Sequence, residues 1–240
     1  MTPPILGAQR VLVVLVTWGP QPFTRDEVQH VVFETDAFYR ESSYGKAWLT
    51  GTVTPWLNAF DGSPGCSVPL IRTAGAAAAR TAGYDPAAYE RIIYVQPSVD
   101  CPWSGVTQAN TIFLDGMLSR KLVAHELGHA FGLPHANSTA CRRAGCPAEE
   151  YGDPYDTMGG GSGDFSAYAK FSLGWLTRIA RPAASGVYQL DRGSLVGASG
   201  VPGDDGSRPV LDRVPGRAGS HRPRRQSRWC RADRPREPEP

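Results

Sequence analysis

The chain has 240 residues, of which 41% are hydrophobic and 10% aromatic, enough to bury one sizeable core. Its formal net charge of +2 gives no reason to expect a nucleic-acid partner, and no window approaches the roughly eighteen consecutive apolar residues of a membrane-spanning helix. We therefore expect a globular protein with no nucleic-acid partner and no membrane span.

The N-terminal part of the chain predicts a strand, a helix and a second strand. The apolar run inside Arg10–Thr17 is too short for a signal peptide and is followed by no cleavage site, so we interpret it as a buried strand. Thr24 and Glu27 have the spacing of a capping box, and the apolar residues after them recur at helical intervals, which predicts a helix over Arg25–Glu41. β-branched and aromatic residues favour a strand over Lys46–Trp56.

The following segments continue this alternation. The alanine-rich segment Leu70–Gly83 predicts a second helix, with a low-complexity linker as the alternative. Arg91–Pro97 is the clearest short strand, and Val106–Leu114 is expected to add one or two more, including a strand at the sheet edge. This order predicts an α/β (α+β) fold with helices packed against a twisted mixed sheet.

Three of the five histidines lie in the segment HELGHAFGLPH. Residues Met117–Phe131 lack proline and contain apolar residues at helical spacing, so we expect a helix that begins near Asp115 or Ser119. His125 and His129 are four residues apart on this helix and therefore project from one face. Two imidazoles in this arrangement can bind one metal ion.

The third histidine follows a glycine. Gly132 can adopt the positive φ that ends a helix and turns the chain, which would bring His135 to the same ion as His125 and His129. Three neutral histidines leave one zinc coordination position for water, as in catalytic sites. Glu126 is placed to accept a proton from that water and to pass it to a leaving amine. We therefore predict one catalytic Zn²⁺ with three histidine ligands, and Glu126 as the catalytic residue.

The same residues resemble a known class of metallopeptidases. HELGHAFGLPH is similar to the zinc signature of the metzincins, and YDTMGG supplies Met158 where those proteins have a methionine turn. Within this class the chain resembles the gametolysin family, in pieces that cover about residues 10–190. The pieces are ESSYGK with LTGTV, CPWSG, the HAN that continues the zinc signature, EYGDPYDTMG and LGW.

The resemblance implies a zincin-like catalytic domain with a five-stranded twisted mixed sheet, an active-site helix and a C-terminal helix below the zinc. DFSAYAKFSLGW, residues 164–175, has the apolar spacing of that last helix. By the same resemblance, Met158 forms an apolar floor beneath the zinc ligands and does not bind the metal. The family also implies a secreted zinc endopeptidase, although this chain shows no signal peptide.

Cysteine content agrees with an extracellular protein. The chain has Cys66, Cys101, Cys141, Cys146 and Cys230, and the four that precede residue 200 could form two disulfides, one across a long segment and one across a tight loop. The alternative is that all five are reduced.

Residues around the methionine turn are candidates for the substrate pocket. Tyr155, Gly159 and Gly160 are predicted to line it, although a packed turn aromatic is the favoured interpretation of Tyr155. Some metzincins have a tyrosine ligand at the position of Gly160, so we expect no such ligand here. The segment Gly159–Asp164 forms either a pocket wall or a plain linker.

Other polar residues have simpler interpretations. Asp153 and Asp156 are expected to hold loops by hydrogen bonds, and calcium binding is the less favoured alternative. His30 and His221 are expected to be solvated histidines.

Composition changes sharply toward the C-terminus. We predict a catalytic domain over residues 1–184 and the start of a truncated β domain over residues 185–200. Residues 201–240 contain seven prolines and ten arginines but no Phe, Tyr or Ile, and such a segment cannot bury enough apolar surface to fold alone. We expect a disordered Pro/Arg-rich tail; a basic interaction segment and a product of a shifted reading frame or truncation stay open as alternatives.

Together these features predict a zinc-dependent endopeptidase that hydrolyses peptide bonds of extracellular proteins. The peptide substrate would lie extended along the edge strand near Val106–Leu114. The alternative is a catalytically inactive or truncated metzincin-like remnant that binds peptide or matrix. A structural zinc protein is a third interpretation, disfavoured by Glu126 and by the lack of a nearby fourth ligand.

Overall fold

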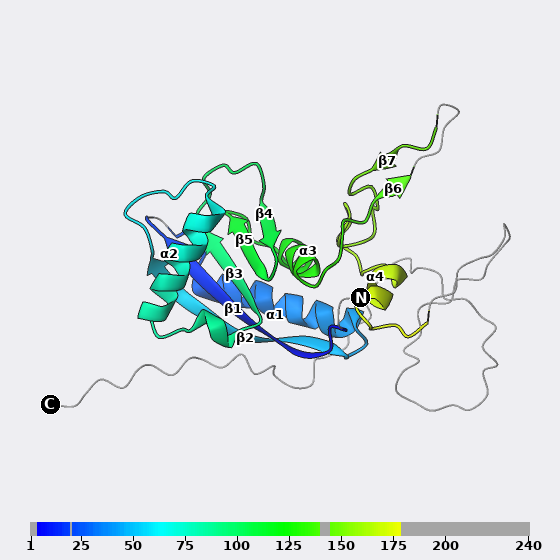
Figure 1. Cartoon of the computed structure of the whole chain (residues 1–240), viewed down its shortest axis with the longest axis horizontal. Helices are drawn as coiled ribbons and strands as arrows, with labels where there is room; N and C mark the ends of the chain where they lie inside the picture. The colour runs from blue at the N-terminus through cyan, green and yellow to red at the C-terminus, as the bar shows by residue number, and fades with distance from the viewer. Residues whose placement is uncertain (1–3, 20, 140–144, 179–240) are drawn as a thin grey trace.

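The computed structural model describes residues 4–19, 21–139 and 145–178 (Figure 1). A five-stranded sheet lies between helices on its two faces. The elements are β1 (Gly7–Thr17), α1 (Arg25–Ser42), β2 (Ala47–Asn58), α2 (Val68–Thr81), η1 (Pro86–Ala88), β3 (Arg91–Gln96), β4 (Gly105–Gln108), β5 (Thr111–Asp115), α3 (Arg120–Ala130), β6 (Ser138–Thr139), β7 (Ala148–Glu149) and α4 (Ala167–Ser172).

The sheet has the strand order β2-β1-β3-β5-β4. Its first four strands are parallel, and only β4, at the edge, pairs antiparallel with its neighbour β5. This topology confirms the predicted mixed sheet and its edge strand. β1 lies between two parallel neighbours, and Val11–Val16 are completely buried, as expected for a strand covered on both faces.

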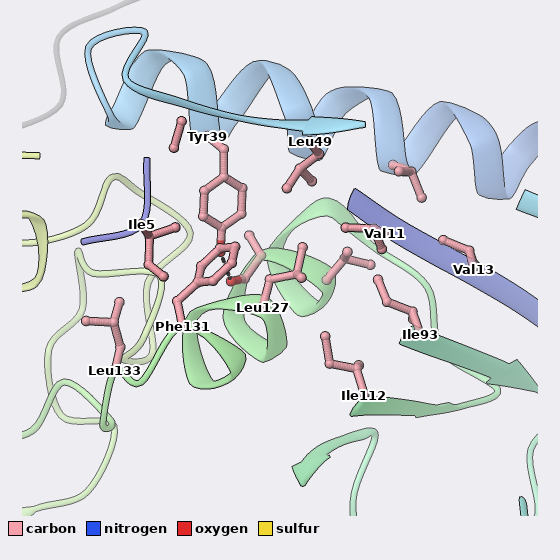
Figure 2. Packing of buried hydrophobic residues seen from close by; sticks show 14 of the residues in the cluster. Ile5, Val11, Val13, Tyr39, Leu49, Ile93, Ile112, Leu127, Phe131 and Leu133 are labelled. Atoms are coloured by element: carbon pink, nitrogen blue, oxygen red, sulfur yellow. Dashed lines mark hydrogen bonds between the residues drawn. The ribbon is translucent and has the colours of Figure 1, made fainter. Parts of the chain in front are cut away.

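The two faces of β1 contribute to two separate cores. Val11, Val13 and Leu15 face the core shared with α1 and α3, which Figure 2 shows from close by. Leu12, Val14 and Val16 point to the opposite face and pack in the core with α2. Successive side chains of a strand point to opposite faces, so one uninterrupted apolar run serves both layers.

Helix α1 also fixes the position of α3. The capping box predicted at its start is present, with Thr24 as N-cap and Glu27 as its partner. Near its other end, the hydroxyl of buried Tyr39 donates a 2.9 Å hydrogen bond to the carbonyl of Ala124 on α3 (Figure 2). The residue that follows Ala124 is His125, so this contact locates the histidine-bearing helix relative to the sheet.

Several alternatives left by the sequence are resolved. The segment that begins at Val68 is helical, so the linker alternative is wrong. Cys66 and Cys101 form a disulfide, so the alternative of five reduced cysteines is also wrong. Cys141, which the second predicted bridge needs, lies outside the described residues, as do Cys230 and His221.

The described chain includes the predicted C-terminal helix but not the segments predicted after it. The C-terminal helix is present but shorter than its apolar pattern: it ends at Ser172, and Gly174 then adopts a left-handed φ of 78°. The segments 185–200 and 201–240, and the end of the predicted domain 1–184, lie outside the described residues. None of the helices in the described ranges combines the length and apolar character that a membrane crossing requires.

Candidate metal centre

Helix α3 begins and ends where its sequence predicts. Ser119 is the N-cap, and its hydroxyl accepts a hydrogen bond from the backbone N–H of Leu122. At the other end Gly132 has φ 95° and donates to the carbonyl of His129, while the N–H of Leu133 donates to Gly128. These bonds form a Schellman motif, which reverses the chain and carries it toward His135.

The three histidines converge as the motif predicts. Candidate ligand atoms of His125, His129 and His135 all lie within 4.8 Å of one another. Nε2 of His129 is 3.1 Å from Nε2 of His125, and the rings of both lie close to that of His135, with centroids 4.7 and 5.4 Å away. This is the only group of metal-binding side chains found among the described residues.

The second nitrogen of each ring determines which atom can bind metal. Nδ1 of His125 is 2.9 Å from the carbonyl of Thr157, and Nδ1 of His129 is 2.8 Å from the carbonyl of Leu133. Nδ1 of His135 is 2.6 Å from Oε1 of Glu150. Carbonyl and carboxylate oxygens accept, so Nδ1 of each ring donates its proton, and a ring that carries its single proton on Nδ1 presents the lone pair of Nε2. The three rings therefore fit a metal ion.

Burial keeps the helical histidines neutral. It lowers the pKa of His125 to about 4, more than the hydrogen bond to Thr157 raises it. The pKa of His129 is also lowered, mainly by burial. A metal ligand must offer an unprotonated nitrogen, so both rings are ready to bind at neutral pH.

Glu126 lies buried between the histidine helix and the edge strand β4. The hydroxyl of Thr107 donates a 2.6 Å hydrogen bond to Oε2 of Glu126. Burial raises the pKa of Glu126 above its ordinary value, and the Thr107 hydrogen bond opposes this rise. Gly105 leaves space for the carboxylate, because a Cβ at that position would lie 2.7 Å from Oε1. A buried carboxylate with a raised pKa suits a general base.

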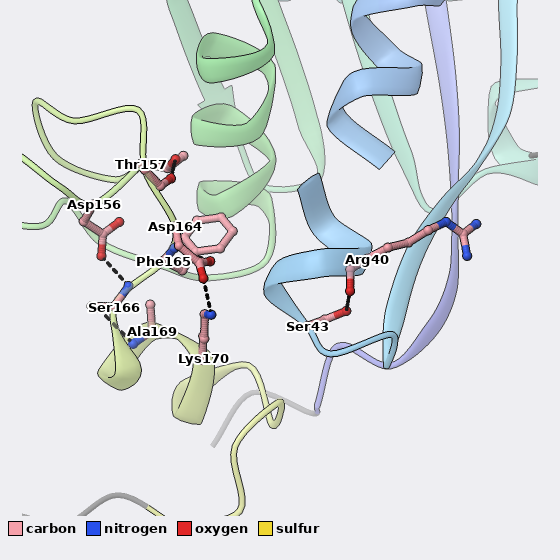
Figure 3. A network of polar contacts seen from close by, with 10 residues as sticks. Arg40, Ser43, Asp156, Thr157, Asp164, Phe165, Ser166, Ala169 and Lys170 are labelled. Atoms are coloured by element: carbon pink, nitrogen blue, oxygen red, sulfur yellow. Dashed lines mark hydrogen bonds and ion pairs between the residues drawn. The ribbon is translucent and has the colours of Figure 1, made fainter. Parts of the chain in front are cut away.

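Met158 lies directly beneath α3. It is 1% exposed, and a Cβ on Gly128 would collide with its sulfur atom. The turn around it is held by Asp156, whose carboxylate accepts hydrogen bonds from the backbone N–H groups of Met158 and Ser166, at 2.7 and 2.8 Å. Figure 3 shows the Asp156–Ser166 bond and the neighbouring ion pair between Asp164 and Lys170.

The predictions for Asp153 and His30 are confirmed, whereas the favoured interpretation of Tyr155 is not. Asp153 accepts from the N–H groups of Tyr155 and Asp156, so it holds a loop as predicted. Tyr155 is 61% exposed within the described part of the chain, which makes the favoured interpretation of a packed turn aromatic wrong. His30 is exposed, as expected.

The glycine-rich segment after the methionine turn is held in place by backbone bonds. The N–H of Gly160 donates to the carbonyl of Tyr151 at 2.7 Å, and Gly163 donates to Tyr155 at 3.0 Å. A Cβ on Gly159 would collide with the carbonyl oxygen of Asp153, so this position requires glycine. These contacts argue against the plain-linker alternative.

Three residues at the site were not identified from the sequence: Thr107, Glu150 and Tyr151. The ring centroid of Tyr151 is 3.9 Å from that of His135, and its backbone has a left-handed φ of 59°. Nothing in the local pattern distinguishes Glu150 from Glu149. The available signal was their position, since Glu150 and Tyr151 open the family-like piece EYGDPYDTMG.

The mixed sheet, the histidine triad on and beyond α3, and the buried methionine below it form the arrangement expected of a metzincin-like zincin fold with a candidate metal site. A family model described as gametolysin peptidase M11 matches residues 22–204. The chain belongs to this family.

Solved structures similar to this chain include archaemetzincin from Methanopyrus kandleri, with 15% identity, a TM-score of 0.40, and coverage of 69% of this chain and 93% of that chain. A second is a chain described as the structure of a chaperone–substrate complex, with 14% identity and a TM-score of 0.42. That match covers 68% of this chain, which spans 30% of the length of the other. A comparison with curated proteins finds no match.

Proposed function

We propose that this protein is a zinc-dependent endopeptidase that hydrolyses peptide bonds of extracellular proteins. His125, His129 and His135 would hold one Zn²⁺, and Glu126 would act as the general base. One observation supports this most strongly: all three Nδ1 atoms have acceptors, so three Nε2 lone pairs converge next to a buried carboxylate.

The chemistry divides between the metal and the protein. Bound zinc would act as a Lewis acid on the scissile carbonyl. Glu126 takes one proton from the attacking water as the new C–O bond forms, and it returns that proton to the amine nitrogen as the C–N bond breaks. Thr107 holds one carboxylate oxygen of Glu126 throughout, which leaves the other oxygen for the water.

The edge strand supplies a surface for the substrate. Among the described residues β4 pairs with β5 alone, so an extended peptide could add to its other side by backbone hydrogen bonds. Thr107 of β4 contacts Glu126, so a peptide on this strand would lie near the base. We propose Tyr155, Gly159 and Gly160 as pocket residues, and Met158 as the apolar support of the metal site.

An extracellular location is part of the same proposal. The gametolysin family is extracellular, and the Cys66–Cys101 disulfide is typical of proteins that fold in oxidising compartments.

The proposed function can be tested directly on the purified 240-residue chain by metal analysis and a cleavage assay. Metal analysis of the purified chain should find one zinc per molecule, and cleavage of casein or gelatin should stop with a chelator and return when zinc is added. Zinc without cleavage would instead support the inactive, peptide-binding alternative. Absence of bound zinc, or cleavage that the chelator leaves unchanged, would contradict the proposal.

A further inference from the structure

The three histidines are supported in different ways. The rings of His125 and His129 bond to backbone carbonyls, which the fold itself fixes. The ring of His135 bonds to a side chain, that of Glu150, and this side chain is 67% exposed. The third histidine therefore depends on a group that the core does not hold in place.

The segment that carries Glu150 returns to His135 through the pairing of two short strands, called the β6–β7 hairpin below. β6 pairs antiparallel with β7, with Ser138 opposite Glu149, and Figure 1 shows this hairpin extending away from the sheet and α3. Glu150 directly follows β7, while His135 lies three residues before β6. The hairpin pairing therefore brings the carboxylate to the imidazole, although fifteen residues separate them.

Tyr151 adds a second contact to the same ring. Its ring centroid lies 3.9 Å from that of His135, with 38° between the ring planes. Its left-handed backbone is fixed at both ends: the N–H donates to Oδ1 of Asn137, and the carbonyl accepts from Gly160. Tyr151 is thus tied both to the chain after the third histidine and to the chain after the methionine turn.

We propose that Glu150 and Tyr151 are positioning residues for the third metal ligand. Glu150 keeps the proton of His135 on Nδ1 and makes Nε2 a stronger electron-pair donor to the metal, and Tyr151 restricts rotation of the imidazole ring. This inference rests on the proposed function, because it takes His135 to be a zinc ligand. It makes retention of the metal depend on the β6–β7 hairpin as well as on the core.

Zinc affinity tests the role of Glu150 without relying on catalysis. The dissociation constant would be measured by competition with a chromogenic chelator for the full chain and for Glu150→Ala, Glu150→Gln and Glu149→Ala. We expect Glu150→Ala to weaken zinc binding about 10- to 100-fold. Glu150→Gln should lie between it and the wild type, since the amide oxygen still accepts a hydrogen bond but carries no charge. Glu149→Ala is the matched control and should stay within about twofold of the wild type.

The role of Tyr151 is tested with the same chelator, by measuring the rate at which each variant releases zinc. Tyr151→Ala should release zinc to the chelator several-fold faster than the wild type, and Tyr151→Phe should restore the slow rate because it keeps the ring. Tyr168→Ala, which removes an exposed tyrosine from α4, is the control for the loss of an aromatic side chain.

Three outcomes decide the proposal. A Glu150→Ala dissociation constant equal to that of wild type or of Glu149→Ala would overturn the role of Glu150. Release from Tyr151→Ala at the wild-type rate would overturn the role of Tyr151. A wild-type chain that binds no zinc would refute the proposed function itself, which separates that failure from a failure of the two positioning residues.

Discussion

The hydroxyl of Thr107, on the edge strand of the sheet, donates a 2.6 Å hydrogen bond to the carboxylate of Glu126 on the histidine helix. The same hydroxyl is 3.0 Å from the carbonyl of Glu126, so strand and helix meet at one side chain. The strand to which we assign substrate binding therefore also positions the residue to which we assign proton transfer.

Replacing Thr107 with valine should slow catalysis. Valine keeps the branched shape but removes the hydrogen bond, and a hydrogen bond to a charged group contributes about 1.5–3 kcal/mol. We expect kcat to fall roughly 10- to 100-fold while KM changes little. In the wild type the hydrogen bond from Thr107 lowers the pKa of Glu126, so removing it should raise that pKa. The acidic limb of the kcat/KM profile should therefore move to higher pH.

Two variants separate this effect from general damage to the strand. Thr107→Ser retains a hydroxyl and should recover most of the activity. Thr111→Val makes the same chemical change on β5, where the hydroxyl donates to the Asn110 side chain and is not part of the candidate site, and should leave kcat unaffected. Equal activity of Thr107→Val and wild type would show that Glu126 needs no support from the strand.

The contact between Gly128 and Met158 predicts a reversal of sign in a double-mutant cycle. In the wild-type background Gly128→Ala should destabilise the protein by about 1–3 kcal/mol, because the methyl group overpacks against the buried sulfur. In a Met158→Ala background the same change should be neutral or stabilising, because alanine is favoured over glycine in a helix by about 1 kcal/mol. Urea unfolding of the four proteins measures this coupling. Additive effects would contradict the close contact.

The zinc-free protein should lose stability as the pH falls from about 6.5 to about 4. In this window His125 is protonated in the unfolded chain, where its pKa is near 6.5, but not in the folded protein, where the pKa is about 4. The unfolded state then binds more protons than the folded state, so the free energy of unfolding falls as the pH falls, by about 3 kcal/mol in total for this group.

Unfolding by urea in the presence of chelator, at pH values across this window, would measure the effect. His125→Asn should have a shallower pH dependence than wild type, whereas His30→Gln, which changes an exposed histidine, should keep the wild-type slope. The same slope in His125→Asn and wild type would contradict the burial effect.

Much of the site could be predicted because its information is local. Two histidines four residues apart on a helix and a glycine at its end determine the geometry without reference to the rest of the fold. The sheet was also predictable, since the apolar run of β1 and the position of β4 follow from period and order. In each case the deciding residues are neighbours in the sequence.

The parts that sequence reasoning missed depend on distant contacts. Thr107 and Glu126 are nineteen residues apart, and His135 and Glu150 fifteen, so neither pair has a local signature. Tyr155 was expected to pack in its turn, but burial of its ring depends on distant parts of the chain, and among the described residues the ring is exposed. The backbone conformation of Tyr151 could not be predicted either, because its left-handed φ is unusual for a bulky residue and is fixed by its hydrogen-bond partners.

The proposed role of Glu126 is tested most directly by the activity and zinc content of Glu126→Gln, measured on the same preparation. Glutamine fills the same space between Thr107 and α3 but cannot accept the proton of water. We predict one zinc per chain, as in wild type, with casein cleavage slowed by at least about 100-fold. Cleavage of casein by Glu126→Gln at the wild-type rate would contradict the assignment of Glu126 as the general base.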